Sequence, residues 1–435
     1  MTNGGENPVT VVDEANLVPV SDHLQRMSDI PASRMFLINK SLAVFRQHHP
    51  DIDMFDASQG DGGASLPGVP PELVERASEL QRLHGSAYDM PYGTDAFRKT
   101  VVEKYWKLDA ASGLGPSNVL ATVGGRDALM KAYSAMLALG HGRTGDLIVV
   151  SRVPWISYNW GPYGIGANVL LAPGRPEDGW AYSEEGLEAC AKYAERMGRK
   201  IAGLIITNPD NPTGNFISPE LQIRLGKTAL RLGFAFVLYD WMYHYITDDR
   251  PMNLNTFVQG FDPAERPRLM FLDGITKSLG ASNIRNSHLI ASEQVTKWIA
   301  ARASHTVIPS FYSLAVAMAA YEMGFENASR SIVEPTNASR RVLRQYLKEN
   351  NFTAILGQGY YAFIKVSQWL KRKGWSHSEQ LGQYLAEKQG LAIVPGTFFS
   401  IYGGDWIRFS YATPVEKTLG AAQRLVEGLN ALVNE

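Results

Sequence analysis

Short, uninterrupted apolar segments alternate with amphipathic helical segments across the middle of the chain, and this alternation constrains the fold more than any other feature. Seven segments have the length and composition of strands: 119–123, 146–150, 168–171, 202–206, 234–239, 269–272 and 288–291. Helical periodicity separates several of them, at 125–139, 183–197 and 218–232. Strands that are apolar on both faces indicate a mostly parallel sheet covered by helices on both sides. We therefore expect an α/β fold with a seven-stranded sheet.

The last third of the chain has a different pattern, typical of a smaller α+β domain. Long helical segments are expected at about 312–350 and 376–389, with strand pairs near 360–366 and 406–411. The N-terminal residues lack a periodic apolar pattern, which favours a flexible arm. The domains we expect are an arm at 1–20, a segment at 21–65 that joins the small domain, a large domain at 66–305 and the small domain at 306–435.

Charge and cysteine content exclude several classes of protein. The 42 basic and 43 acidic residues leave no global field for nucleic acid or a membrane surface. The N-terminus does not resemble a signal peptide, and the apolar stretch at 314–320 is too short to span a bilayer. Because Cys190 is the only cysteine, an internal disulfide and a cysteine-rich metal site are excluded, and the histidines lack ligand spacing. We expect a soluble, cytoplasmic protein with a small-molecule site and no metal.

The most specific motif is the seven-residue sequence from Asn208 to Gly214, Asn-Pro-Asp-Asn-Pro-Thr-Gly, directly after the expected strand at 202–206. Its two Asn-Pro pairs and its Thr-Gly favour a fixed turn. Ligands of open α/β sheets gather at the carboxyl ends of the strands, where this turn lies. A plain tight turn would explain a single Asn-Pro, but hardly this whole sequence.

Two further strands are followed by residues that can do chemistry. Asp240 ends the strand at 234–239, and Tyr243 comes three residues later. An acid at a buried strand end needs a partner, although a helix cap is the more common explanation. Thr276 and Lys277 follow the strand at 269–272, with Arg285 eight residues beyond the lysine. A lysine held away from bulk water can form a Schiff base, although an isolated lysine in this setting is more often on the surface.

Two glycine-rich turns and an arginine in an apolar strand are the remaining candidate site elements. Gly125 and Arg126 lie between a strand and a helix, where free backbone N–H groups favour a phosphate. An ordinary glycine turn explains this element equally well. Arg408 lies in an apolar strand, so it needs a carboxylate partner from the protein or from a substrate. Gly60 lies in a second glycine-rich loop at 56–63.

In this order the motifs resemble the class I/II aminotransferase family of the fold-type I pyridoxal 5'-phosphate (PLP) enzymes. The resemblance runs from about residue 55 to the C-terminus, and its most specific parts are the Asn208–Gly214 sequence and the spacing from Lys277 to Arg285. It implies PLP as cofactor, a large sheet domain with a smaller domain, and an active homodimer.

The resemblance also implies a role for each matching residue on the cofactor. Lys277 matches the Schiff-base lysine, and Arg285 matches the arginine that binds the cofactor phosphate, together with Gly125, Arg126 and Thr276. Trp155 matches the aromatic residue that stacks on the pyridine ring. Asn211 and Tyr243 match the donors to the ring hydroxyl, and Asp240 matches the carboxylate under the ring nitrogen.

The remaining matches concern the substrate and the partner subunit. Arg408 matches the arginine that binds the substrate α-carboxylate, with help from the backbone near Gly60. Tyr88 resembles the tyrosine that reaches the phosphate of the neighbouring subunit. The implied reaction moves the amino group of an L-amino acid to a 2-oxo acid through pyridoxamine phosphate, with Lys277 as the general base.

Several positions depart from the family pattern and indicate a divergent member. Arg126 and Asp127 stand where a small hydroxyl residue and an amide or acid are usual, and Gly274 stands where a serine is common. A PLP-dependent lyase, decarboxylase or oxidase would keep the same residues, because the cofactor carries the reaction. A non-catalytic regulator on the same fold is the third alternative, and the short N-terminal arm argues against an attached DNA-binding domain.

Overall fold

The computed structural model describes residue 12 and residues 23–434. The arm predicted at 1–20 therefore lies outside the described residues, apart from Val12. No helix in the described part of the chain is long and apolar enough to cross a membrane.

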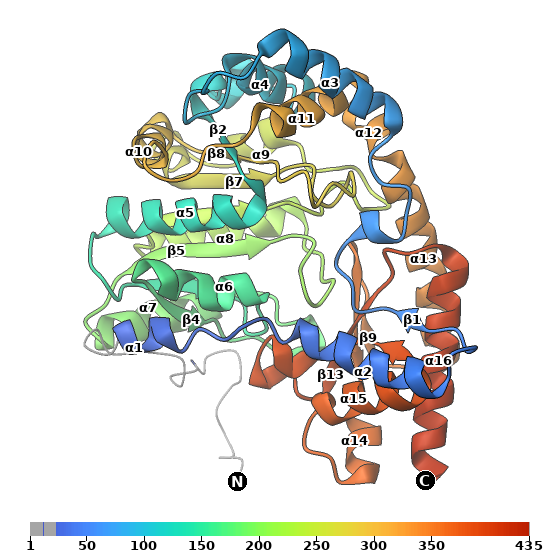
Figure 1. Cartoon of the computed structure of the whole chain (residues 1–435). Coiled ribbons are helices and arrows are strands. Elements are labelled where there is room, and N and C mark those ends of the chain that lie inside the picture. Colours follow the sequence, from blue (N-terminus) through green and yellow to red (C-terminus); the bar gives the residue numbers. More distant parts are fainter. Residues whose placement is uncertain (1–11, 13–22, 435) are drawn as a thin grey trace.

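A seven-stranded sheet lies at the centre of the larger part of the molecule (Figure 1). Its strands are β2 (Val119–Thr122), β3 (Leu147–Val150), β4 (Asn168–Leu171), β5 (Ile201–Thr207), β6 (Phe236–Asp240), β7 (Leu269–Asp273) and β8 (Ser287–Ile290). Their order is β2-β8-β7-β6-β5-β3-β4. Only β8 is antiparallel to its neighbours, β2 and β7. This confirms the predicted mostly parallel sheet and places all seven strands close to their predicted positions.

Helices cover both faces of the sheet because successive side chains of each strand point to opposite faces. In β6, Val237 and Tyr239 pack into one core with α7 (Glu184–Arg196), α8 (Pro219–Arg231) and α9 (Leu254–Gln259). Leu238 packs into the other core with α5 (Gly124–Gly140) and α10 (Glu293–Ala303). Continuous apolar strands are therefore required, as the sequence indicated.

A second, four-stranded sheet lies in the C-terminal part of the chain, in the order β12-β13-β10-β9. Its two longer strands, β10 (Tyr361–Lys365) and β13 (Trp406–Ser410), are antiparallel. The other elements here are β9 (Ala354–Ile355), β12 (Val394–Pro395), α14 (Ser367–Lys373), α15 (Ser378–Gln389) and α16 (Val415–Asn434).

Residues from near the N-terminus lie against this C-terminal part. The short strand β1 (Phe55–Asp56) runs parallel to β11 (Leu391–Ala392). Helix α2 (Met35–His48) contacts α15, whereas the preceding α1 (His23–Ser28) lies near the large sheet (Figure 1). Pro31 lies in the segment that separates α1 from α2.

The helical segment predicted over about 312–350 is divided into three helices: α11 (Phe311–Met323), α12 (Phe325–Ala328) and α13 (Arg330–Glu349). Gly324 ends α11 at a φ of +87°, a backbone conformation that glycine adopts without steric cost. Helix α11 packs against α3 (Pro71–His84) and α4 (Asp95–Thr100) at one end of the sheet (Figure 1).

Candidate active site

The carboxyl ends of β5, β6 and β7 open into a cavity of about 1280 Å³ between the large sheet and the C-terminal part. This is the edge at which open parallel sheets bind ligands. The cavity brings together eleven of the twelve residues predicted for the site: Gly60, Gly125, Arg126, Trp155, Asn211, Asp240, Tyr243, Thr276, Lys277, Arg285 and Arg408.

Lys277 lies in the loop after β7, and its half-buried side chain lines this cavity. Its Nζ donates a hydrogen bond to the backbone oxygen of Gly60. Burial lowers the pKa of Lys277 to about 8; the charge of Asp61 opposes this shift, and the nearby arginines, Arg408 among them, add to it. A lysine with this pKa is partly neutral near physiological pH, as a nucleophile or general base must be.

Asp240 is the last residue of β6, and its side chain is only 4% exposed. Tyr158 donates a hydrogen bond to its Oδ2 at 2.7 Å, and the Met242 N–H donates to Oδ1 at 3.1 Å. Burial nevertheless raises the pKa of Asp240 to about 6. No described basic side chain forms a salt bridge with this carboxylate, so a cation in the cavity would stabilise its charged form.

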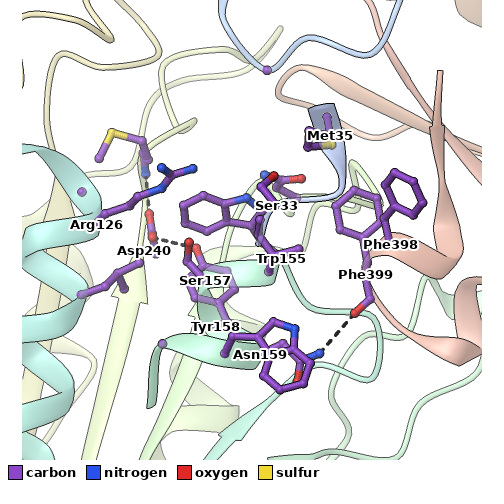
Figure 2. Close-up of a pocket in the computed structure, with 18 of the residues that line it drawn as sticks. Ser33, Met35, Arg126, Trp155, Ser157, Tyr158, Asn159, Asp240, Phe398 and Phe399 are labelled. Atoms are coloured by element: carbon purple, nitrogen blue, oxygen red, sulfur yellow. Dashed lines mark hydrogen bonds between the residues drawn. The ribbon is translucent and has the colours of Figure 1, made fainter. Parts of the chain in front are cut away.

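Trp155 and Arg126 form one wall of the cavity, close to Asp240 (Figure 2). Trp155 immediately precedes α6 (Ile156–Trp160), and its ring packs edge-on against that of Tyr158 at 5.4 Å. The Arg126 guanidinium lies 5.6 Å from the centre of the Trp155 ring. A flat aromatic ligand between this wall and the strand ends would lie against the Trp155 ring.

The start of α5 and Arg285 together form a positively charged corner of the cavity. Arg285 donates to the backbone oxygens of Ser282 at 2.7 Å and Val123 at 3.3 Å. Gly124 has a φ of +77°, which favours glycine, and a Cβ there would lie 2.4 Å from an Arg285 nitrogen. Burial and the neighbouring charge of Arg126 lower the pKa of Arg285. Two arginines beside a helix N-terminus favour a phosphate here.

Two of the unusual residues noted in the sequence have local explanations in this corner. Asp127 accepts from the Val123 N–H at 2.8 Å and from Lys131 Nζ at 2.6 Å, so it holds the start of α5. A Cβ on Gly274 would lie 2.6 Å from the Ser287 Cα, which leaves no room for a serine there. Thr276 donates to the Asn286 backbone oxygen at 3.4 Å.

Arg408 enters the cavity from β13 and is 4% exposed. Its Nη1 donates to Asn211 Oδ1 at 2.9 Å, and its Nη2 donates to the Ser58 backbone oxygen at 2.8 Å. Its Nε is buried without a partner in the described structure, and no described carboxylate forms a salt bridge with it. A buried guanidinium in this state can still bind a carboxylate.

Tyr243 also lines the cavity, and its hydroxyl group is 3.1 Å from that of Tyr361. The Lys277 Nζ lies 6.0 Å from the centre of the Tyr243 ring. The Arg408 guanidinium lies 4.2 Å from the centre of the Tyr361 ring. Tyr361 therefore contacts both Tyr243, which lies near Lys277, and Arg408.

Tyr88 is the twelfth predicted residue, and it does not line the cavity. Its side chain is 99% exposed in the single chain. The neighbouring Leu83 and Met90 are also largely exposed. Nearby, the His84 ring stacks on Phe311, with ring centres 3.6 Å apart.

Tyr158 and Asp61 are among the residues of the site that sequence reasoning missed. Tyr158 lies three residues after Trp155, so one helical turn aims both rings at the same region. Asp61 directly follows Gly60 in the glycine-rich loop and lines the cavity near Lys277. The helical spacing could have indicated Tyr158, whereas the sequence around Asp61 contains no comparable signal.

Known proteins match this chain over nearly its full length. The family model for aminotransferase class I and II matches residues 54–425. The aspartate aminotransferase of Thermotoga maritima is 24% identical, over 94% of this chain and 99% of its own. The aromatic-amino-acid aminotransferase 2 of Thermococcus litoralis is 23% identical, over 86% of this chain and 93% of its own.

Solved structures share the fold. The aspartate aminotransferase from Thermus thermophilus with maleate superposes with a TM-score of 0.76 at 23% identity, covering 93% of this chain and 98% of that one. An aminotransferase from Mycobacterium tuberculosis gives a TM-score of 0.78 at 18% identity, covering 93% of this chain and 98% of that one. Since the family model covers most of the sequence, the chain belongs to the aminotransferase class I and II family.

Proposed function

We propose that this chain is a PLP-dependent aminotransferase, which moves the amino group of an L-amino acid to a 2-oxo acid. The observation that carries the proposal is the meeting of three groups in one cavity. These are Lys277, which has a lowered pKa, and two buried groups that form no salt bridge with any described residue, the Asp240 carboxylate and the Arg408 guanidinium. Family membership favours transamination over lyase, decarboxylase or oxidase chemistry.

The donor set of the cavity fits PLP. Arg285, Arg126 and the N–H groups at Gly125 would hold the phosphate, because positive charge is concentrated there. Asp240 would face the ring nitrogen, since its buried carboxylate gains stability from a proton on that atom. Trp155 would cover the ring, and Asn211 and Tyr243 would contact the ring hydroxyl. Thr276 would support the phosphate side. When bound, PLP supplies an acceptor for the electrons of the substrate Cα–H bond.

The protein residues then have distinct tasks. Arg408, held by Asn211 and the Ser58 carbonyl, would bind the substrate carboxylate beside the Gly60 backbone and fix the direction of the Cα–H bond. Lys277 would accept the Cα proton on Nζ, because its lowered pKa leaves part of it neutral. Arg408 is buried and Lys277 is half-buried, which limits access of water to the transferred proton.

The rest of the cavity wall favours an amino acid with an aromatic or large apolar side chain. The residues that form it are mostly apolar or aromatic: Met35, Met130, Ile156, Trp160, Phe398, Phe399 and Ile401. Arg34 is also there, but it forms a salt bridge with Glu379 and lies over the Phe398 ring. Figure 2 shows Met35 and Phe398 on the side of the cavity away from Asp240.

We also propose that the enzyme works as a homodimer in which Tyr88 reaches the phosphate site of the partner subunit. Tyr88 is exposed and lies away from the cavity of its own chain. Leu83 and Met90, close to it in the sequence, are also largely exposed apolar residues. A tyrosine has both an apolar ring to bury and a hydroxyl group to donate, which suits an interface near a phosphate.

The cofactor site is tested by incubating the chain with PLP, reducing with borohydride and mapping the labelled peptide. The label is expected on Lys277, and a label distributed over surface lysines would contradict the assignment.

The substrate class is tested by comparing kcat/KM for phenylalanine, tyrosine and leucine with that for aspartate. A clear preference for aspartate would disprove the proposed apolar subsite without affecting the cofactor assignment.

A further inference from the structure

Residues 60–63 of the glycine-rich loop pack with their backbone against the backbone of the loop that carries Lys277. A Cβ on Gly63 would lie 2.0 Å from the backbone oxygen of Gly280, so nothing larger than glycine fits there. Tyr360 donates a hydrogen bond to the Lys277 backbone oxygen at 2.6 Å, and a Cβ on Gly62 would lie 2.5 Å from the same tyrosine hydroxyl. These close contacts fix the position of Asp61 relative to Lys277.

Both carboxylate oxygens of Asp61 are held. Oδ1 accepts from the Gly63 N–H at 3.1 Å, and Oδ2 accepts from the Ser282 hydroxyl group. Ser282 lies on the same loop as Lys277 and also lines the cavity. No described basic side chain forms a salt bridge with Asp61. Its negative charge is therefore available to act on the cavity.

The charged groups around the Lys277 amine are unevenly balanced. Arg408, Arg126 and Arg285 disfavour its protonated form, and Asp61 favours it. The carboxylate of Asp240 also interacts with Lys277, as the electrostatics of that acid show. Asp240 would be engaged by the cofactor ring in the loaded enzyme, which leaves Asp61 as the acid opposing the three arginines.

We propose that Asp61 is a positioning residue for Lys277, whose carboxylate balances the positive charge that the lysine acquires when it takes the proton from the substrate Cα. The proton moves from Cα to Nζ, and the ammonium group that results donates to the Gly60 carbonyl and is favoured by the negative charge of the neighbouring Asp61. This inference rests on the proposed role of Lys277 as the base, and it adds Asp61 to the residues that act on the Lys277 amine.

A purely structural role for Asp61 would be to cap the short helical turn Gly62–Ala64, which its side chain does. The variant Asp61→Asn separates the two roles. The asparagine side chain keeps an oxygen for the Gly63 N–H but loses the negative charge. The variant Asp61→Glu keeps the charge, and Ser282→Ala removes one hydrogen bond while leaving the Asp61 charge in place.

The test measures the titration of Lys277 directly, in the full-length chain freed of cofactor. The rate at which trinitrobenzenesulfonate modifies Lys277 is followed by peptide mass spectrometry from pH 6 to pH 10, because the reagent attacks only the neutral amine. For the native chain the midpoint is expected near the lowered pKa of about 8. We expect Asp61→Asn to shift the midpoint down by about half a pH unit or more, while Asp61→Glu and Ser282→Ala stay close to the native value.

An unchanged midpoint in a folded Asp61→Asn variant would overturn the proposal, and so would an equal shift in Ser282→Ala. Thermal unfolding verifies that each variant is folded. If Asp61→Asn does not fold, Asp61→Ser replaces it, since serine also caps a helical turn without a charge. This readout does not depend on turnover, so failure of the aminotransferase assignment would be seen separately, as absence of amino-group transfer with a normal lysine titration.

Discussion

The hydroxyl group of Tyr158 donates a hydrogen bond to Oδ2 of Asp240 at 2.7 Å, and both side chains are buried. The bond connects α6, next to Trp155, with the end of β6 (Figure 2). It favours the charged form of the acid and opposes burial, which raises the pKa of Asp240 to about 6. Tyr158 therefore helps to keep Asp240 ionised near neutral pH.

We predict that Tyr158→Phe weakens PLP binding, because the pKa of Asp240 rises further when this donor is lost. A hydrogen bond to a charged group contributes about 1.5–3 kcal/mol, so the dissociation constant is expected to rise roughly tenfold or more. The deficit should be larger at pH 6 than at pH 8, since the acid is protonated first at low pH. Fluorescence titration with PLP measures it. Tyr133→Phe is the matched control, because the Tyr133 hydroxyl donates to the Ser157 backbone and not to Asp240; equal affinities in both variants would disprove the role.

The half-buried Lys277 is expected to reduce the stability of the cofactor-free chain. Its pKa is about 8 in the folded state and 10.5 in its ordinary state, so the unfolded chain binds more protons between these values. Stability should therefore rise with pH across this window, and the full cost is present below pH 8. We predict that Lys277→Met raises the free energy of unfolding at pH 7 by up to about 3 kcal/mol. Chemical denaturation at pH 7 and pH 10 measures this, with Lys297→Met, an exposed lysine, as control. A Lys277→Met variant less stable than native at pH 7 would contradict the prediction.

Replacing Arg408 with lysine should raise the KM for the amino-acid donor by roughly tenfold to a hundredfold, because lysine keeps the charge but not the fork that binds a carboxylate. The native fork is held by Asn211 and Ser58. PLP affinity should stay close to native, which separates substrate binding from folding. Arg344→Lys is the control, since this arginine donates to the backbone oxygens of Leu356 and Gly357 at the surface of the same part of the molecule. An unchanged KM in Arg408→Lys would remove this arginine from the substrate site.

The proposed action of Tyr88 across the dimer can be tested by mixing two inactive variants. In a mixed dimer of Tyr88→Ala and Lys277→Ala, one site has its own Lys277 and the partner's Tyr88. Random pairing gives mixed dimers in about half of the population, each with one complete site, so about a quarter of native activity should return. No recovery, with mixed dimers shown by affinity tags, would place Tyr88 in the site of its own chain or outside any site.

The positions of the strands could be predicted because a parallel sheet buried on both faces requires continuous apolar segments. The order of the strands could not, since the apolar pattern of β8 does not reveal that it lies antiparallel between β2 and β7. The division of the segment at 312–350 was also missed, although Gly324 was visible in the sequence. A single glycine inside an apolar helical pattern does not say whether the helix continues through it.

Some residues of the site could likewise be predicted from the sequence, whereas their long-range contacts could not. Lys277, Arg285 and the Asn208–Gly214 turn could be found because each lies in a local motif after a strand. The contact of Tyr158 with Asp240 joins residues that are 82 positions apart. The loop of Gly60 and Asp61 meets Lys277 across 217 positions. Such pairings depend on how the loops pack, which periodicity and composition do not describe.

Transfer of the amino group to the cofactor can be observed in a single half-reaction. The PLP-loaded chain is mixed with an L-amino acid in the absence of any 2-oxo acid, and the absorbance of the cofactor is followed through a single turnover. We predict that the cofactor is converted to pyridoxamine phosphate in equal amount to the 2-oxo acid formed, and that Lys277→Ala shows no conversion. Release of product while the cofactor stays as PLP would contradict the claim and identify lyase, decarboxylase or oxidase chemistry instead.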